Sequence, residues 1–406
     1  MSLIRFLFKR LAIDRGNHLS RLVVRIAIAG VATGIVVILA ASAIVTGFQE
    51  SIPVKFTGFW GHIQISRLEL SQSFEQSPFQ LRPDQVDSII KHPDIQWVAP
   101  YATKAGILRT DEAFEGIVLK GIDGSYKTDF LQSTLIAGKM PEFDGNDPAN
   151  DILLPESVAK KLELEVGDKI QCYFIQEPPR LRVFTISGIY KLGIEGEFSK
   201  PYVISDLRHI RKLNGWEDDQ MGSLEVHLGD MKALQSTAYQ LSDQLDVTLE
   251  AYSIQDLYPN LFNWLNLFDL NKQVLMIIML LVAGINMVSA LFILILERTQ
   301  TIGLFKAFGM QTRSISSLFI LTGAYIAGMG MLIGNALAMV FFWLQTRYKI
   351  IGLDESSYYV DAVPLAIGWQ EWLLLNLLTF ASCVVLLLLP AFAISRIRPV
   401  EAIRFS

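Results

Sequence analysis

The chain has 406 residues and a formal net charge of −5, with 51% hydrophobic and only 18% charged residues. This charged fraction is low for a soluble protein. The charge is unevenly divided, because residues 49–270 carry 20 basic and 33 acidic side chains whereas the rest of the chain carries 15 and 7. The acidic excess therefore belongs to one long central stretch, and no nucleic-acid partner is expected.

Four long uncharged runs predict four membrane-spanning helices. A helix of about 20 apolar residues crosses the ~30 Å hydrocarbon core of a bilayer, and each run reaches that length. The predicted spans are residues 22–49, whose uncharged part begins after Arg25, and residues 273–296, 314–346 and 372–395. Residues 50–271 form a large domain between the first and second spans, and the later connections are 297–313 and 347–371.

Basic residues indicate which parts face the cytoplasm. The N-terminal segment, the connection 297–313 and the tail 396–406 are all cationic, and cationic flanks stay inside. The domain 50–271 and the short loop 347–371 then lie on the outer side. Arg5 and Lys9 are one helical turn apart, so residues 1–20 are predicted to form an interfacial amphipathic helix.

The first apolar run has two interpretations. Its triplet Ala41-Ser42-Ala43 resembles a signal-peptide cleavage site. However, the run is longer than the apolar core of a signal peptide, about 7–15 residues. It also contains Gly30 and Gly34 at the spacing of a helix-packing face. We therefore expect a retained span, and either interpretation places the following domain outside.

The outer domain is predicted to be an α/β sandwich with an insert. Strand, helix and strand patterns occur at its start, near residues 62–110, and again at its end, near residues 222–252. Brought together, the two halves give a ferredoxin-like arrangement. Residues of about 125–215 read as a β-rich insert, in which strands Val166–Phe174 and Leu181–Tyr190 flank the turn Ile175–Arg180.

No catalytic, metal-binding or cofactor motif is found. The string "GIDGSYKT" from Gly121 has the wrong spacing for a phosphate-binding loop, and the five histidines are scattered. No charge lies within the runs 26–49, 273–296, 314–346 and 372–395, which argues against an ion-coupled relay. The energy for any transport is therefore expected from a partner, and we predict that the chain is not itself an enzyme.

The cytoplasmic connection "ERTQTIGLFKAFGMQTRS" (Glu297–Ser314) predicts a short, strongly apolar helix that ends at Gly309. Such a helix either lies on the bilayer surface or plugs into a cytoplasmic motor. Small residues in the third span, Gly323/Ala327 and Gly330/Gly334/Ala338, are spaced for helix packing.

The same connection closely resembles the "ER…IG.LKA.G" signature of FtsX-like permeases, in the MacB superfamily of ABC transporters. The tail "ISRIRPVEAIRFS" resembles the closing segment of that family. The strings "ESSYYVDAVPLAI" (Glu355–Ile367) and "DILLPESVAKKLELEVGDKI" (from Asp151) resemble the lipoprotein-releasing branch, the LolC/LolE type. The resemblance covers nearly the whole chain.

The resemblance implies a fold and a function. The fold would be four transmembrane helices plus a large α+β periplasmic domain, a porter-like α/β sandwich with a β-rich, sabre-like insert. The protein would be a permease subunit in the bacterial inner membrane that extracts triacylated lipoproteins from the outer leaflet and passes them to a periplasmic, LolA-like carrier. A second permease subunit, identical or related, and a LolD-like ATPase dimer that binds the ATP would complete the complex.

The resemblance also implies three groups of functional residues. ATPase coupling would fall to Glu297, Arg298, Ile302, Gly303, Leu304, Phe305, Lys306, Phe308 and Gly309. The lipoprotein cavity would be lined by Ile38, Ala41, Ser42, Val45, Phe48, Ile277, Leu280, Leu281 and Gly284, although helix packing uses the same residue types. Carrier contact is expected at Pro178, Pro179 and Arg180, in a turn shorter than the long hook of LolC.

Two other functions share parts of this pattern. A MacB-type exporter or mechanotransmitter would keep the fold with different cargo, but MacB carries a fused ATPase and no ATPase motif occurs here. An FtsX-like regulator of a cell-wall hydrolase would have a much smaller outer domain. A membrane-anchored enzyme has no motif to support it.

Overall fold

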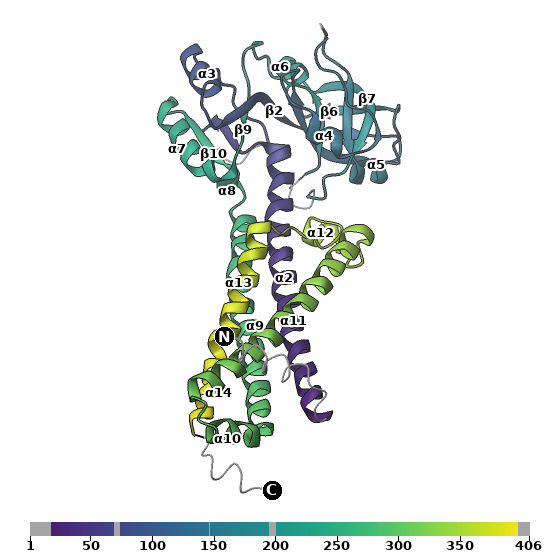
Figure 1. Cartoon of the computed structure of the whole chain (residues 1–406). Helices are drawn as coiled ribbons and strands as arrows, with labels where there is room; N and C mark the ends of the chain where they lie inside the picture. The colour runs from purple at the N-terminus through teal and green to yellow at the C-terminus, as the bar shows by residue number, and fades with distance from the viewer. Residues whose placement is uncertain (1–17, 69–73, 146, 195–199, 397–406) are drawn as a thin grey trace. The chain divides into compact units, whose positions relative to one another are not determined.

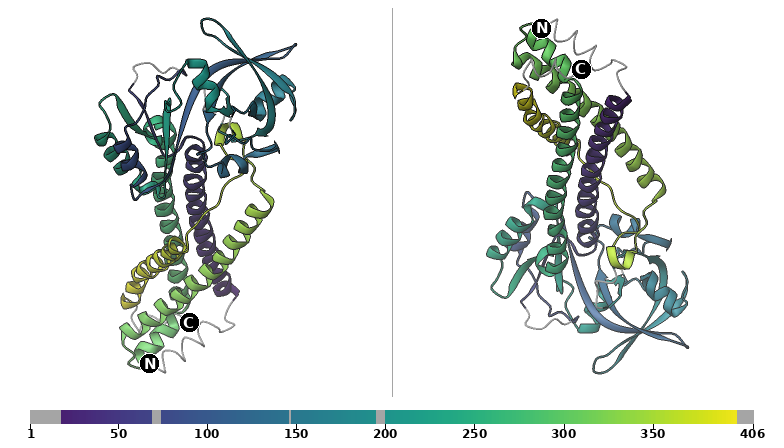
Figure 2. Two further views of the ribbon diagram at one scale, coloured as in Figure 1. Left: turned by 90° about the horizontal axis from the view of Figure 1, so that it is seen from above. Right: turned by 90° about the horizontal axis from the view of Figure 1, so that it is seen from below.

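The structure is a computed structural model that describes residues 18–68, 74–145, 147–194 and 200–396 (Figures 1 and 2). The chain divides into two compact units. The membrane unit contains residues 1–50, 264–352 and 362–406, and the soluble unit contains residues 51–263 and 353–361. The predicted helix at residues 1–20 and the tail 396–406 fall almost wholly outside the described residues.

Four helices of the described chain are long and apolar enough to cross a membrane. The third and fourth spans are separated by residues 349–368, and the fourth breaks into two helices near Pro390. The helices are α2 (His18–Trp60), α9 (Pro259–Glu297), α11 (Thr312–Tyr348), α13 (Trp369–Leu386) and α14 (Leu388–Arg396), with the short α10 (Thr299–Ala307) between α9 and α11. The predicted four-helix class is confirmed, and α2 and α9 extend well beyond the apolar runs.

Helix α2 packs closely against its neighbours through small residues. A Cβ atom added at Gly334 of α11 would lie 2.6 Å from the backbone oxygen of Ala32, and one added at Gly330 would lie 2.9 Å from that of Ile28. A Cβ atom added at Gly34 of α2 would lie 3.4 Å from the Cβ of Ala283 on α9, which is an ordinary contact distance. Because association in lipid depends on such close backbone approach, these glycines confirm the predicted packing role.

The first prediction concerns this contact. Gly334→Ala should destabilise the membrane unit by about 1–3 kcal/mol, because the added methyl overlaps backbone atoms that cannot move independently. Gly328→Ala on the same helix is the matched control, since nothing lies within 4 Å of its Cβ position. Thermal unfolding of the purified chain in detergent measures both. Equal midpoints for the two variants would contradict the packing assignment.

The soluble unit is built on one ten-stranded sheet with the order β10-β1-β9-β2-β3-β8-β5-β7-β4, in which β6 pairs with both β2 and β7. The strands are β1 (Ile63–Arg67), β2 (Ile95–Arg109), β3 (Phe114–Ile122), β4 (Leu135–Gly138), β5 (Asp151–Pro155), β6 (Lys169–Phe174), β7 (Arg180–Tyr190), β8 (Tyr202–Asp206), β9 (Ser223–Leu228) and β10 (Leu249–Ser253). The helices are α3 (Pro83–Ile90), α4 (Asp129–Ser133), α5 (Glu156–Leu162), α6 (Leu207–Asn214), α7 (Leu234–Gln244), α8 (Ile254–Leu257) and α12 (Glu355–Tyr358), with a 3₁₀ turn at Met231–Ala233.

One end of the sheet has the predicted ferredoxin-like arrangement. Strands β10, β1, β9 and β2 are all antiparallel to their neighbours, in the order expected when two strand-helix-strand units interleave. Helices α3 and α7 lie side by side, joined by hydrogen bonds such as Ser88 Oγ to Gln244 Oε1 at 2.6 Å (Figure 1). The two distant chain segments therefore form one sandwich.

The other end holds the β-rich insert. Strands β6 and β7 form the predicted hairpin, and β5 with helix α5 matches the predicted strand and helix near residue 151. Helices α5 and α6 cover a buried core that includes Leu154, Phe184 and Ile210. The sequence patterns did not identify β4, β8 or α6, which complete this half.

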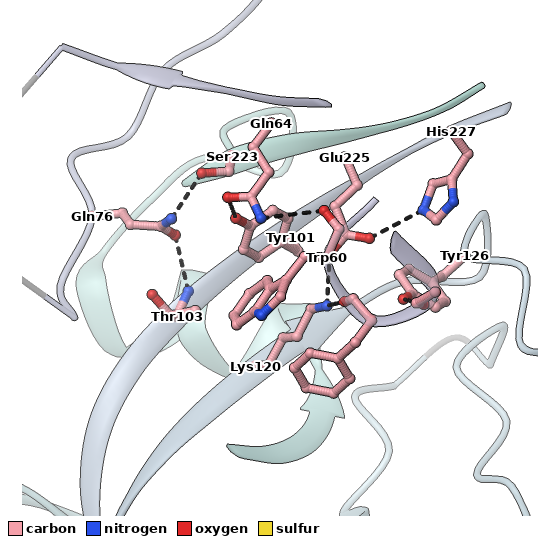
Figure 3. A network of polar contacts seen from close by, with 12 residues as sticks. Trp60, Gln64, Gln76, Tyr101, Thr103, Lys120, Tyr126, Ser223, Glu225 and His227 are labelled. Carbon is pink, nitrogen blue, oxygen red and sulfur yellow. Dashed lines mark hydrogen bonds and ion pairs between the residues drawn. The ribbon is translucent and has the colours of Figure 1, made fainter. Parts of the chain in front are cut away.

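A buried polar network surrounds the end of helix α2 within the soluble unit (Figure 3). Lys120 and Glu225 form an ion pair of 2.6 Å, and their side chains are only 1% and 0% exposed. The ammonium group of Lys120 also donates to the backbone oxygen of Phe59 and lies 4.3 Å from the centre of the Phe59 ring. Burial lowers the pKa of Lys120, and Glu225 opposes that shift. The carboxylate, the carbonyl and the ring faces together make the buried charge tolerable.

His62 lies two residues after the end of α2, and its surroundings favour the neutral form of its ring. Its Nδ1 accepts a hydrogen bond from the backbone N–H of Leu228 at 3.3 Å, which requires an unprotonated nitrogen. Burial, and secondarily the neighbouring His227, lower the pKa of His62 to about 4.

The second prediction follows from this shift. Between pH 6.5 and 4 the unfolded chain binds a proton at His62 that the folded chain does not, so stability should fall as the pH is lowered through this window, by up to about 3 kcal/mol. His62→Gln should flatten that part of the profile. Thermal midpoints of the wild-type and variant chains in detergent between pH 7 and 4.5 provide the test. Parallel profiles would show that other groups cause the pH dependence.

Candidate functional site

A narrow apolar cleft lies within the membrane unit, among helices α2, α9 and α13. Apolar side chains form most of its walls, and Ser42 and Lys272 are the polar residues that contribute to it. The lining residues are Val37, Ile38, Ala41, Ser42, Lys272, Leu275, Met276, Met279 and Leu375. Three helices that are far apart in the sequence therefore share one apolar pocket.

Three of the five cavity residues predicted on the first span line this cleft. Ile38, Ala41 and Ser42 line it. Val45 and Phe48 are buried, and the ring of Phe48 packs against those of Trp264 and Phe268, with centroids 6.5 and 5.6 Å away.

The cavity residues predicted on the second span have different surroundings. Ile277 and Leu281 are 55% and 54% exposed on the surface of α9. Leu280 packs against the apolar cluster around Ile35, whereas a Cβ atom at Gly284 would lie 2.0 Å from Leu386. The structure therefore divides the predicted set between the cleft, the helix interfaces and an open apolar surface.

A polar cluster joins the three helices beside the cleft. Glu371, in the first turn of α13, accepts hydrogen bonds from Ser42 Oγ at 2.5 Å and from Thr46 Oγ1 at 3.4 Å. It also forms an ion pair with Lys272 of α9. Glu371 and Lys272 each stand at the end of an apolar run, and the sequence reasoning placed both outside the spans. Charges at the ends of two apolar runs were the signal that was missed.

The third prediction tests this cluster. Glu371→Gln removes the charge that Lys272 faces and should destabilise the membrane unit by about 1–2 kcal/mol, because a charged hydrogen bond is lost at a poorly hydrated site. The looser cleft should let a maleimide react faster with an introduced Cys at Ala41. The background should be low because Cys172 and Cys383 are buried.

Glu297→Gln is the control for this experiment, since Glu297 is an exposed carboxylate at the other end of α9. Unfolding midpoints and labelling rates of the two variants are compared in detergent. If Glu297→Gln and Glu371→Gln behave alike, the cluster does not hold the cleft together.

The predicted coupling residues divide into an anchored side and an exposed side. Ile302 is fully buried, Gly303 is buried, and Phe305 packs against the apolar cluster of the membrane unit that includes Ile315. Leu304 and Phe308 are 48% and 81% exposed. The remaining predicted residues lie around them: Glu297 is exposed at the end of α9, Arg298 precedes α10, and burial lowers the pKa of Lys306.

Gly309 ends this segment as predicted. Its φ angle of +82° lies in the left-handed region that favours glycine. Phe308 is thus held at the corner between α10 and α11, with most of its ring uncovered. An apolar surface of this kind favours burial against a partner or lipid.

The turn between β6 and β7 carries the residues predicted to contact a carrier. Pro178, Pro179 and Arg180 are all exposed, as is Ile175 with 78% of its surface uncovered. The turn is short, as the sequence indicated. Among the described residues, no group of His, Cys, Asp and Glu side chains is placed to hold a metal ion.

Sequence comparison decides the family. A profile of the MacB-like periplasmic core domain matches residues 26–244, which is more than half of the chain, and a profile of the FtsX-like permease C-terminal domain matches residues 273–399. The chain belongs to the FtsX-like permeases with a MacB-like periplasmic core domain. The resemblance inferred from the coupling segment and tail is confirmed.

Several relatives of this permease are similar over nearly their whole length. The lipoprotein-releasing system transmembrane protein LolC of Xylella fastidiosa (strain Temecula1 / ATCC 700964) is 22% identical over 400 residues, covering 93% of this chain and 92% of its own. LolC of Neisseria meningitidis serogroup B is 22% identical, with 96% and 95% covered. LolE of Haemophilus influenzae is 21% identical, with 95% of each chain covered. The permease is therefore of the LolC/LolE type.

Solved structures match parts of the permease more distantly. The periplasmic region of MacB from Actinobacillus actinomycetemcomitans is 18% identical, with a TM-score of 0.36, 50% of this chain covered and 92% of that one. The extracellular domain of the transporter YknZ from Gram-positive bacteria is 15% identical, with a TM-score of 0.33 and coverage of 47% and 99%.

Proposed function

We propose that this chain is the permease subunit of an ATP-driven complex that extracts lipoproteins from the outer leaflet of the inner membrane and transfers them to a periplasmic carrier. The observation that carries the proposal is the apolar interface of α2, α9 and α13 with its polar cluster at Glu371. The cleft in this interface is closed to about 10 Å³ in the single chain, so it would have to widen to admit acyl chains. Acyl chains need an apolar surface, and the polar head of a lipidated residue needs hydrogen-bond partners beside it. The full-length similarity to proteins named for lipoprotein release supports this cargo class.

The energy would come from a separate cytoplasmic ATPase. The exposed side chains Leu304 and Phe308 give α10 an apolar contact surface, and the buried Ile302 fixes that surface to the membrane unit. A push on Phe308 is then transmitted into the helices rather than absorbed by a mobile loop. The polar residues Glu297, Arg298 and Lys306 would orient the contact.

A second permease subunit would complete the cavity. Ile277, Leu281 and Ile285 are each more than half exposed along α9, next to the cleft-lining residues of the same helix. A second chain, identical or related, would cover this apolar surface and enlarge the narrow cleft. On the soluble side, the turn with Pro178, Pro179 and Arg180 is the proposed contact for the carrier.

The fourth prediction tests the cargo. A photoreactive amino acid at Ala41, which lines the cleft, should form adducts with triacylated lipoproteins in cells that express the permease with its ATPase. The adducts should decrease when ATP turnover is allowed, and mass spectrometry identifies them. The same probe at Leu332 is the control, because that side chain is 68% exposed on α11. It should capture only bulk lipid.

Other outcomes point to other functions. Adducts with non-lipidated peptides at Ala41 would favour a MacB-type exporter. Adducts with only a neighbouring helix or bulk lipid would favour a regulator that moves no cargo, of the FtsX type. Either result would overturn the lipoprotein-releasing assignment.

A further inference from the structure

The connection between the third and fourth spans contains the string "ESSYYVDAVPLAI", which has no role in the function proposed above. Its residues 353–361 belong to the soluble unit, although the chain on either side belongs to the membrane unit. Within it, α12 is a single turn, and a hydrogen bond of 2.9 Å from the N–H of Leu353 to the oxygen of Asp361 closes the loop. The string with Tyr358, Tyr359 and Asp361, which resembles the lipoprotein-releasing branch, is therefore a compact loop closed on itself.

Glu355 fastens this loop to two other elements of the soluble unit. Its Oε1 lies 3.6 Å from Nζ of Lys55 on α2, and its Oε2 forms an ion pair with Lys191, the residue after β7. Lys55 makes a second contact with the loop, because its Nζ donates to the backbone oxygen of Tyr359 at 2.6 Å. The Glu355 side chain is only 22% exposed, so water screens these interactions less than on an open surface.

The surroundings are closely fitted to this arrangement. Gly193 has a φ angle of +75°, and a Cβ atom there would lie 2.1 Å from Oε1 of Glu355 and 2.7 Å from Nζ of Lys55. Beside the ion pairs, the rings of Phe56 and Tyr359 meet edge to face with centroids 6.3 Å apart, and Val360 is buried. The loop is therefore held by apolar contacts as well as by ion pairs.

The flanks of the same connection are fixed separately within the membrane unit. The side chain of Gln345 bonds the backbone of Ile351 at 2.9 and 3.1 Å and the oxygen of Val363 at 3.1 Å. The N–H of Ala366 donates to the oxygen of Ala43 on α2 at 2.9 Å. A chain segment that is held at both flanks and in its middle transmits tension, whereas a free loop would absorb it.

We propose that Glu355 makes this connection a strap, by which movements of α11 and α13 are transmitted to the soluble unit in each transport cycle. The inference rests on the proposed function, since it assumes a cycle that moves these helices. Glu355 acts through Lys55 and Lys191 and is not among the residues that line the cleft, so it is a positioning residue. When its charge is removed, ATP hydrolysis continues but is no longer efficiently coupled to movement of the soluble unit.

The fifth prediction compares Glu355→Gln with Glu115→Gln in the complete complex. Glu115 is a matched control, because it is 21% exposed and pairs with Lys161 at 2.5 Å elsewhere in the soluble unit. In Glu355→Gln, ATP-driven lipoprotein release should fall about fivefold or more, the usual size of a coupling between sites, while ATP hydrolysis keeps at least about half its rate. Glu115→Gln should change neither, and Glu355→Asp should partly restore release.

A cargo-independent measurement accompanies the release assay. Amide hydrogen exchange should accelerate in residues 353–361 of Glu355→Gln, and the ATP-dependent change in exchange near Lys191 should be lost. Lys191→Gln should have a similar effect, and combining it with Glu355→Gln should add little, because both remove the same ion pair.

The outcomes separate the two proposals. Faster exchange with normal release, or unchanged exchange and release, would overturn the strap. A parallel loss of ATP hydrolysis, release and thermal stability would also overturn it, since it would make Glu355 merely structural. If the wild-type complex releases no lipoprotein but the exchange results hold, the cargo assignment fails while the strap stands.

Discussion

Close backbone approach around helix α2 is the constraint on which the rest of the molecule depends. Without water to drive helices together in lipid, association relies on contact distance, and the glycines facing Ala32 and Ala283 set that distance. Once α2 is fixed, Ile38 and Ser42 are placed in the cleft. Later in the same helix, within the soluble unit, Lys55 pairs with Glu355. One helix therefore contributes to packing, to the candidate cargo site and to the proposed strap.

In the soluble unit, the main constraint is that the long helix α2 ends inside a folded domain. The last carbonyl groups of a helix lack partners within it, and burying them without partners is costly. Lys120 reaches the oxygen of Phe59, and Glu225 balances the charge that this brings into the core. The polar network therefore makes the end of α2 a fixed point of the sheet rather than a frayed terminus.

The sequence predicted what repeating patterns encode and missed what depends on tertiary contact. Apolar runs and strand-helix-strand patterns identified the four spans and the ferredoxin-like half. Lys120 is the one charged residue within the otherwise apolar run Ile117–Ile122 of its strand, and nothing local indicates that its partner is Glu225. In the sequence, Glu371 and Lys272 are recognisable only as charged residues at the ends of two apolar runs. Their ion pair depends on how α9 and α13 pack. In the candidate site, the apolar residue types were predictable but their exposure was not. Ile38 is buried whereas Ile277 is more than half exposed.

The 15-residue strand β2 has a consequence for how this domain can be rebuilt. Its first half pairs with β9 of the sandwich, and its last residues pair with β6 of the insert, so a single strand belongs to both. Excising the insert would strip partners from β2 and from β3, leaving two bare strand edges of the kind that recruit other chains. Domain grafts between relatives should therefore be joined in the loops that flank β2 and β3 rather than at the limits of the insert. The β2–β3 pair contributes to both halves of the sheet, so it must be transferred or kept as a unit.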